Sequence, residues 1–143
     1  NSMKSRVVKV IFDTNIWISF LIGKRLSGIR PYISDGRIQI VTTDLPLREI
    51  KEVTGRKKLR KYFAPQSVDE LMELLELIAE KVHIPTPVHT ICRDPKDNFL
   101  LDLIDFSQAD FLVTGDADLL AHNPFMTARI LSPSEFEELL ESL

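Results

Sequence analysis

The chain of 143 residues is poor in the side chains that form disulfides or bind zinc. Its single cysteine, Cys92, excludes an internal disulfide. His83, His89 and His122 are scattered along the chain, without the spacing of a zinc site. The longest hydrophobic runs, such as 16–22, are interrupted and far shorter than a membrane span. These absences argue against a disulfide-rich secreted protein, a zinc protein and a membrane protein.

The N-terminal residues, the charge and the composition narrow the class of protein further. Nothing near the N-terminus reads as a signal peptide, so we expect a protein of the reducing cytoplasm. Asn1 and Ser2 precede Met3 and are expected to be left over from cloning. Acidic residues outnumber basic ones by 21 to 18, which argues against a surface built throughout to bind nucleic acid. A hydrophobic fraction of 44% predicts one compact domain over residues 3–143.

Short apolar runs alternate with amphipathic segments from end to end, without an internal repeat. We expect strands at 7–12, 38–41, 111–114 and 128–131, and helices at 16–22, 26–34, 43–54, 67–82, 97–106, 119–120 and after 132. Ser67 with Glu70, and Ser132 with Glu135, have the spacing of capping boxes at two helix starts. The alternation predicts an α/β fold with a mainly parallel sheet that helices cover on both faces.

Acidic residues stand at the positions where an α/β sheet places its functional groups. Asp13 directly follows the first predicted strand, and Asp116 follows the third. The carboxyl ends of parallel strands border the functional crevice of such folds. Asp97 begins the helix before the Asp116 strand, so its side chain can point to the same edge. Glu49 lies at the border of the apolar face of its helix, where it can reach inward.

Converging carboxylates repel one another unless a cation lies between them. Mg²⁺ and Mn²⁺ prefer oxygen ligands, and such ions catalyse phosphodiester cleavage by activating a water and stabilising the charge on the reacting oxygens. Each acid also has a simpler interpretation. Asp13 and Asp116 could cap the helices that follow them, Asp97 could merely suit a helix N-terminus, and Glu49 could be an ordinary solvated acid.

The acids lie in four motifs, which are Asp13-Thr14-Asn15 after the first strand, Glu49 within 47–50, Asp97 within 93–98, and Thr114-Gly115-Asp116-Ala117-Asp118. In this order the motifs resemble those of the PIN-domain family of metal-dependent ribonucleases, and the resemblance extends from Val7 to the C-terminus. The ending 130–136 is similar to the branch of the family described as toxins of toxin–antitoxin systems. The resemblance implies a three-layer α/β/α fold with a mainly parallel central sheet of four to five strands.

The resemblance also implies a role for each acid. The implied ligands of the catalytic Mg²⁺ or Mn²⁺ are Asp13, Glu49, Asp97, Asp116 and, directly or through water, Asp118. Asn15 would orient Asp13, and Thr114 would orient a metal-bound water. Asp94 lies three residues before Asp97 and could take its place as the third ligand.

The resemblance implies a single-stranded RNA substrate, a homodimer and a small antitoxin protein that blocks the acidic groove. A basic run could contact the RNA backbone or could be a solvated surface segment; it contains Arg56, Lys57, Lys58, Arg60 and Lys61. Tyr62 and Phe63 follow it and could stack on a base or anchor the segment. Without the four principal ligands, 17 of the 21 acids remain against 18 bases, a balance of +1, so only the excess acidity of the chain is concentrated in the proposed pocket.

Three alternatives remain open at this point. A haloacid-dehalogenase-like phosphatase expects a second aspartate where this chain has Asn15. A receiver-like phospho-acceptor domain expects adjacent acids after the first strand and a lysine after the last. Here Phe12 precedes Asp13, and the last strand runs into Ser132. A PIN-like binding module without catalytic activity is the third alternative, against which the retention of all four acids argues.

Overall fold

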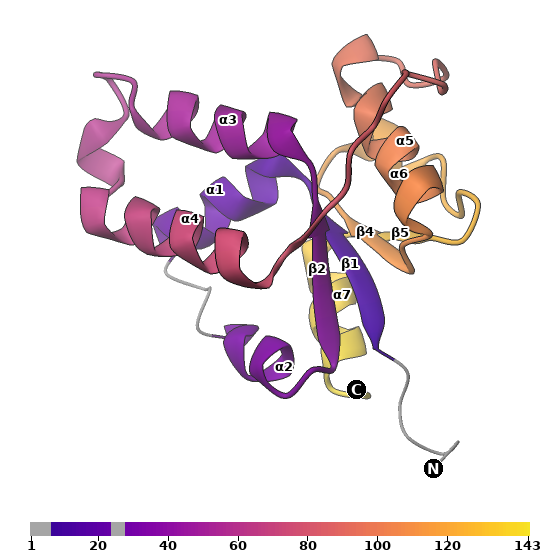
Figure 1. Ribbon diagram of the computed structural model, residues 1–143, viewed down its shortest axis with the longest axis horizontal. Helices are drawn as coiled ribbons and strands as arrows, with labels where there is room; N and C mark the ends of the chain where they lie inside the picture. The colour runs from indigo at the N-terminus through magenta and orange to yellow at the C-terminus, as the bar shows by residue number, and fades with distance from the viewer. Residues whose placement is uncertain (1–6, 24–27) are drawn as a thin grey trace.

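The computed structural model describes residues 7–23 and 28–143, which form an α/β fold around a five-stranded parallel sheet (Figure 1). The strands are β1 (Val8–Phe12), β2 (Ile38–Thr42), β3 (Glu80–Lys81), β4 (Phe111–Val113) and β5 (Arg129–Leu131). The α-helices are α1 (Thr14–Gly23), α2 (Arg30–Ser34), α3 (Asp44–Thr54), α4 (Pro65–Ile78), α5 (Asn98–Ser107), α6 (Ala117–Leu120) and α7 (Pro133–Leu140). Two short 3₁₀ helices are η2 (Arg60–Tyr62) and η3 (Pro95–Asp97). The predicted fold class is confirmed.

The sheet is buried on both faces because successive side chains of a strand point in opposite directions. Val10 and Phe12 of β1 belong to one hydrophobic cluster, to which α1, α2, α3, α4 and α7 contribute. Ile11 belongs to a second cluster with residues of α5 and α6. Figure 1 shows α5 and α6 on one side of the sheet and α1, α3 and α4 on the other. The result is the three-layer arrangement that the sequence predicts.

The strand order β3-β2-β1-β4-β5 positions the acidic residues. The chain runs outward from β1 through β2 to β3 and then returns to place β4 on the other side of β1. Phe12 pairs with Val113 in this parallel ladder, so Asp13 and Thr114 leave neighbouring strands side by side. The topological switch point, where α/β folds place their ligand crevices, therefore lies between the carboxyl ends of β1 and β4.

Two expectations about the middle of the chain are wrong. Helix α4 begins at Pro65 with Ala64 as its N-cap, so Ser67 lies within the helix and forms no capping box. Proline at the first helical position fixes a helical φ, which starts the helix earlier than the serine motif suggests. The helix also ends at Ile78, because β3 pairs with β2 and the backbone N–H of Val82 donates to the carbonyl of Thr42 over 2.8 Å.

Other local predictions can be compared directly. The capping box before α7 is confirmed, since Ser132 and Glu135 bond to each other's backbone N–H groups. The predicted start of the 26–34 helix lies partly outside the described residues, within which α2 covers Arg30–Ser34. Within the part of the chain that the structure describes, no helix combines the length and the apolar character needed to cross a bilayer.

Candidate functional site

Asp13 and Thr114 form the buried centre of the carboxyl edge of the sheet. The Thr114 hydroxyl donates to Oδ2 of Asp13 over 2.8 Å, and the backbone N–H of Asn15 lies 3.4 Å from Oδ1. Thr114 is fully buried and Asp13 is 9% exposed. Burial raises the pKa of Asp13, the hydrogen bond from Thr114 opposes this effect, and the charge of Asp116 adds to it. Thr114 thus contacts Asp13 through its side chain, whereas Asn15 does so through its backbone.

Asp116 stands at the end of β4 as the N-cap of α6. Its Oδ1 accepts the backbone N–H of Asp118 over 2.9 Å, and its own backbone N–H donates to the Thr114 hydroxyl over 3.1 Å. The simpler interpretation of Asp116 as a helix cap is therefore correct for one of its oxygens. Asp118 is exposed, and its Oδ1 lies 3.6 Å from the guanidinium of Arg93.

Asp97 faces Asp13 and Asp116 from the start of α5. Burial and the charges of these two carboxylates raise the pKa of Asp97 to about 6, and a hydrogen bond with the Asp116 side chain contributes. Asp94 is exposed, and its Oδ1 accepts the backbone N–H of Lys96 over 3.0 Å. Its carboxylate therefore caps η3, which favours Asp97 over Asp94 as the acid that faces the edge.

Glu49 reaches the same edge from the middle of α3. It is half-buried between the core residues Leu47 and Ile50. Burial and the charge of Asp13 raise its pKa, whereas the ammonium of Lys96 lowers it. The acids predicted from the sequence are therefore close enough for Asp13 to influence the ionisation of both Glu49 and Asp97.

The donor chemistry of this edge suits a hard divalent cation. Every candidate ligand is a carboxylate, and oxygen donors are what Mg²⁺ and Mn²⁺ prefer. The hydroxyl of Thr14, beside Asp13, is a buried oxygen without a hydrogen-bond partner among the described residues. Among these residues, however, no three histidine, cysteine or acidic side chains are already arranged to hold a metal. A cation bound at this edge would offset the mutual repulsion of the carboxylates.

The predicted basic segment lies at the far end of α3 from the sheet, where it joins α3 to α4 (Figure 1). The guanidinium of Arg56 makes two hydrogen bonds to Glu52, of 3.0 and 2.8 Å. Phe63 is buried and anchors the segment. Tyr62 is 54% exposed, with the Lys61 ammonium 5.2 Å from its ring centroid.

Three residues lie near the acidic edge although the sequence did not place them there. Arg93 approaches Asp118, Lys96 influences Glu49, and the pKa of the buried Cys92 thiol is raised by burial and then by the charges of nearby aspartates. Their position in the segment just before Asp97 could have indicated this. If α5 begins at the carboxyl edge of the sheet, the segment that leads into α5 must also pass along that edge.

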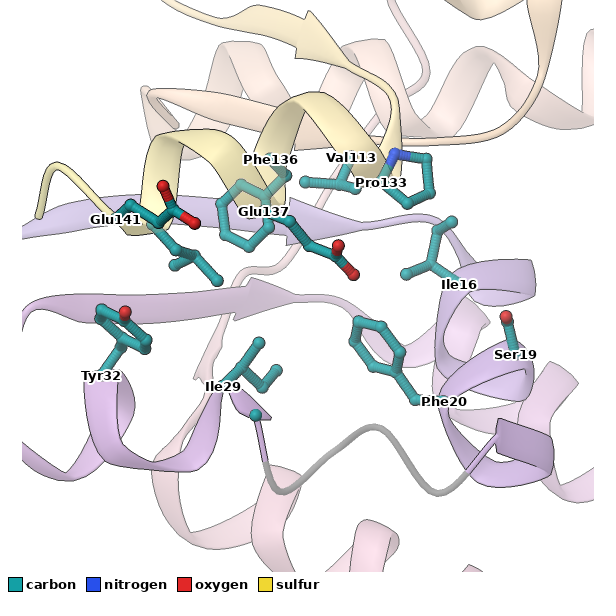
Figure 2. A pocket seen from close by; sticks show the side chains of 12 residues that line it. Ile16, Ser19, Phe20, Ile29, Tyr32, Val113, Pro133, Phe136, Glu137 and Glu141 are labelled. Atoms are coloured by element: carbon teal, nitrogen blue, oxygen red, sulfur yellow. The ribbon is translucent and has the colours of Figure 1, made fainter.

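A cavity of about 390 Å³ lies elsewhere, between α1, α2 and α7. Figure 2 shows the carboxylate of Glu137 pointing into the space between α1 and α7, among the side chains of Ile16, Phe20 and Phe136. The lining is mainly hydrophobic, and its carboxylates are those of Glu137 and Glu141. Because this cavity lacks the set of acids found at the ends of β1 and β4, we place the candidate chemistry at the acidic edge.

Known proteins resemble the chain over nearly its whole length. An uncharacterized protein of Methanocaldococcus jannaschii, MJ1680, is 29% identical to it over an aligned length of 151 residues. The alignment covers 97% of this chain and 96% of the relative. The crystal structure of PAE2754 from Pyrobaculum aerophilum has a similar fold, with a TM-score of 0.61 and 14% sequence identity. The match covers 95% of this chain and 91% of that structure.

A family comparison matches residues 9–118 to the description "PIN domain". The matched span begins in β1 and ends at Asp118, so it contains all of the candidate acids. PIN domains are generally nucleases and typically bind divalent metals. By the match over most of its length, the chain belongs to the PIN-domain family.

Proposed function

We propose that this protein is a metal-dependent endoribonuclease that cleaves single-stranded RNA at the acidic edge between β1 and β4. The observation that supports the proposal best is the shared electrostatic environment of Asp13, Asp97 and Asp116. The pKa values of Asp13 and Asp97 are raised by burial and by the charges of their acidic neighbours. Such an excess of uncompensated carboxylates is costly unless it serves to bind a cation.

The proposed ligands of Mg²⁺ or Mn²⁺ are Asp13, Glu49, Asp97 and Asp116, with Asp118 joining directly or through water. A bound ion would supply an activated water and stabilise the charge that develops on the phosphate oxygens. The chain's own residues position this chemistry. Thr114 holds the carboxylate of Asp13 by a 2.8 Å hydrogen bond, and the cap of α6 holds Asp116.

The basic segment supports a polynucleotide as the substrate. Its proposed phosphate contacts are Arg56, Lys57, Lys58, Arg60 and Lys61. Helical geometry places Thr54, the last residue of α3, about 7.5 Å from Glu49 along the helix axis. Glu52, one turn after Glu49 on the same face, is bonded to Arg56, so that face leads from the acidic edge to the cations. A strand of RNA can reach both places, whereas a single nucleotide occupies one of them.

The test is cleavage of a labelled single-stranded RNA with and without Mg²⁺ or Mn²⁺, by the wild-type protein and by the Asp13→Asn and Asp116→Asn variants. We expect metal-dependent cleavage by the wild type and a loss of at least a hundredfold in either variant. Cleavage that survives a chelator or either substitution would contradict the proposal. Metal and RNA binding without any cleavage would favour a catalytically inactive PIN-like binding module. A stable phosphoryl-aspartate would favour the receiver-like alternative.

We further propose that the enzyme is the toxin of a toxin–antitoxin pair, acts as a homodimer and works on RNA in the cytoplasm. The toxin role rests on the similarity of residues 130–136 to the toxin branch of the family, and the homodimer rests on the resemblance to the family as a whole. The cytoplasmic location rests on the single cysteine, which suits a reducing compartment. Expression of the wild type and of Asp116→Asn in a bacterial host tests the toxin role. Growth arrest by the wild type that the variant does not cause would support a toxin. Light scattering of the purified protein measures the oligomeric state, and a monomeric mass would overturn the dimer.

A further inference from the structure

The segment that leads into α5 is a short loop fastened at both ends. The backbone N–H of Cys92 donates to Oδ1 of Asn98 over 2.9 Å, which ties the start of the loop to the first turn of α5. Within the loop, Oδ1 of Asp94 accepts the N–H of Lys96, and the Asp94 carbonyl accepts the N–H of Asp97 over 3.0 Å. Residues on this loop are therefore held in place relative to the acidic edge before any ligand binds.

The loop carries two cations that border the acidic edge on different sides. Arg93 lies towards α6, with Nη1 3.6 Å from Oδ1 of Asp118, and its side chain is 83% exposed. Lys96 lies towards α3, where its charge acts on Glu49. Lys96 is exposed, and among residues 7–23 and 28–143 no carboxylate lies within ion-pair distance of its ammonium.

Neither cation makes a strong ion pair with another described residue. An ion pair at 3.6 Å with a side chain as exposed as that of Arg93 contributes little to stability. A phosphate oxygen can therefore replace Asp118 at the guanidinium at little cost. In the proposed function, the metal ion holds the scissile phosphate. The Lys96 ammonium lies next to the carboxylates that bind this ion, so it is well placed to attract the negatively charged phosphates on either side of the scissile one.

We propose that Arg93 and Lys96 are substrate-positioning residues that bind the phosphates flanking the scissile one. This inference rests on the proposed nuclease function and deepens it. Both cations belong to the loop before α5, Arg93 towards α6 and Lys96 towards α3, and the basic segment lies beyond α3. The substrate is then a single polynucleotide strand that crosses the acidic edge, and a mononucleotide is a poor ligand.

The test measures RNA binding separately from cleavage. Each variant carries Asp116→Asn to prevent cleavage, and fluorescence anisotropy of a labelled single-stranded oligouridylate in Mg²⁺ buffer gives the binding constant at several salt concentrations. We expect Lys96→Gln and Arg93→Gln each to weaken binding about tenfold and to reduce the slope of log K against log salt by about 0.7. Lys96→Arg should restore the slope, because it restores the charge.

Arg30→Gln is the matched control. Arg30 is exposed on α2, which precedes the amino end of β2 and lies away from the acidic edge. This variant loses one positive charge but should keep the wild-type slope. Circular dichroism and thermal unfolding check that all variants are folded.

The possible results separate the inference from the proposed function. Unchanged slopes in Lys96→Gln and Arg93→Gln, an equal change in Arg30→Gln, or no RNA binding by the parent protein would each overturn the inference. If Lys96 merely offsets the charge of the acids, Lys96→Gln would tighten Mg²⁺ binding and leave the RNA slope unchanged. Failure of the proposed function appears instead as an absence of cleavage by the wild-type chain in the separate Mg²⁺ and Mn²⁺ assay.

Discussion

Thr114 connects the sheet to the candidate ligands at the scale of single residues. Its hydroxyl donates to Asp13 and accepts the N–H of Asp116, and its side chain is fully buried. We expect Thr114→Val to raise the pKa of Asp13 further and to lower the free energy of unfolding by about 1–2 kcal/mol, because a buried carboxylate loses its donor. Urea denaturation measures this change. Thr114→Ser keeps the hydroxyl and should cost less; equal losses in the two variants would count against the hydrogen bond.

Asp97 should make stability depend on pH. Its pKa rises from 3.8 to about 6 in the folded protein, so the folded state binds this proton more tightly than the unfolded state. The resulting stabilisation is present at low pH and is lost as the pH rises through the window between these two values. Above that window, in a chelator, Asp97→Asn should raise the free energy of unfolding by about 1 kcal/mol, after allowing for solvent screening.

The comparison for this prediction is urea denaturation on both sides of that window. Asp94→Asn is the control, because asparagine keeps an acceptor for the backbone N–H of Lys96. The difference in stability between Asp97→Asn and the wild type should grow with pH. A difference that stays constant, or that is reproduced by Asp94→Asn, would show that Asp97 is not the group responsible.

Helix starts show at the scale of elements where local motifs suffice and where they fail. The sequence contains similar serine–glutamate motifs at Ser67 and Ser132, but only Ser132 caps a helix. Ser132→Ala should lower the free energy of unfolding by about 1 kcal/mol, because α7 loses its N-cap hydrogen bond. Ser67→Ala should be neutral or slightly stabilising, because alanine is the better helix former inside α4. Thermal unfolding of both variants checks the contrast, which a similar loss in each would contradict.

Strand β3 could not be predicted from its own residues. It consists of Glu80 and Lys81, which lack the β-branched, apolar pattern of a strand, and Val82 continues the helical spacing of α4. Its pairing comes from β2, whose open edge supplies the backbone partners Val41 and Thr42. A two-residue strand of this kind is stabilised by its neighbour rather than by its own propensity.

At the scale of the whole molecule, metal binding should stabilise the fold. We expect Mn²⁺ or Mg²⁺ to raise the melting temperature, with about 1.4 kcal/mol gained for each tenfold increase in concentration beyond the dissociation constant. The Asp13→Asn/Asp116→Asn variant should lose this response. Asp69→Asn, on the exposed side of α4, should keep it. Differential scanning fluorimetry at constant ionic strength measures the shift, and an equal response in the double variant would contradict a metal at this edge.

Local sequence determined most of the helices and strands, with β3 as the exception, and it determined which acids stand at their ends. Three local signals can be recognised in the sequence without knowing the fold, because each involves only a few neighbouring residues. They are the periodic spacing of apolar residues, the β-branched run of β1 and the capping box of α7. The positions of Asp13, Asp97 and Asp116 relative to β1, α5 and β4 follow from the same local patterns. Membership of the PIN-domain family agrees with the resemblance that these motifs suggest.

Only the tertiary structure decided which of these side chains meet. Thr114 and Asp13 are 101 residues apart in the sequence, and they come within 2.8 Å because β4 returns to pair with β1. The approach of Lys96 to Glu49 likewise depends on how α3 and α5 pack on opposite faces of the sheet. Strand order and helix packing depend on the burial of the whole core, and no short motif encodes them.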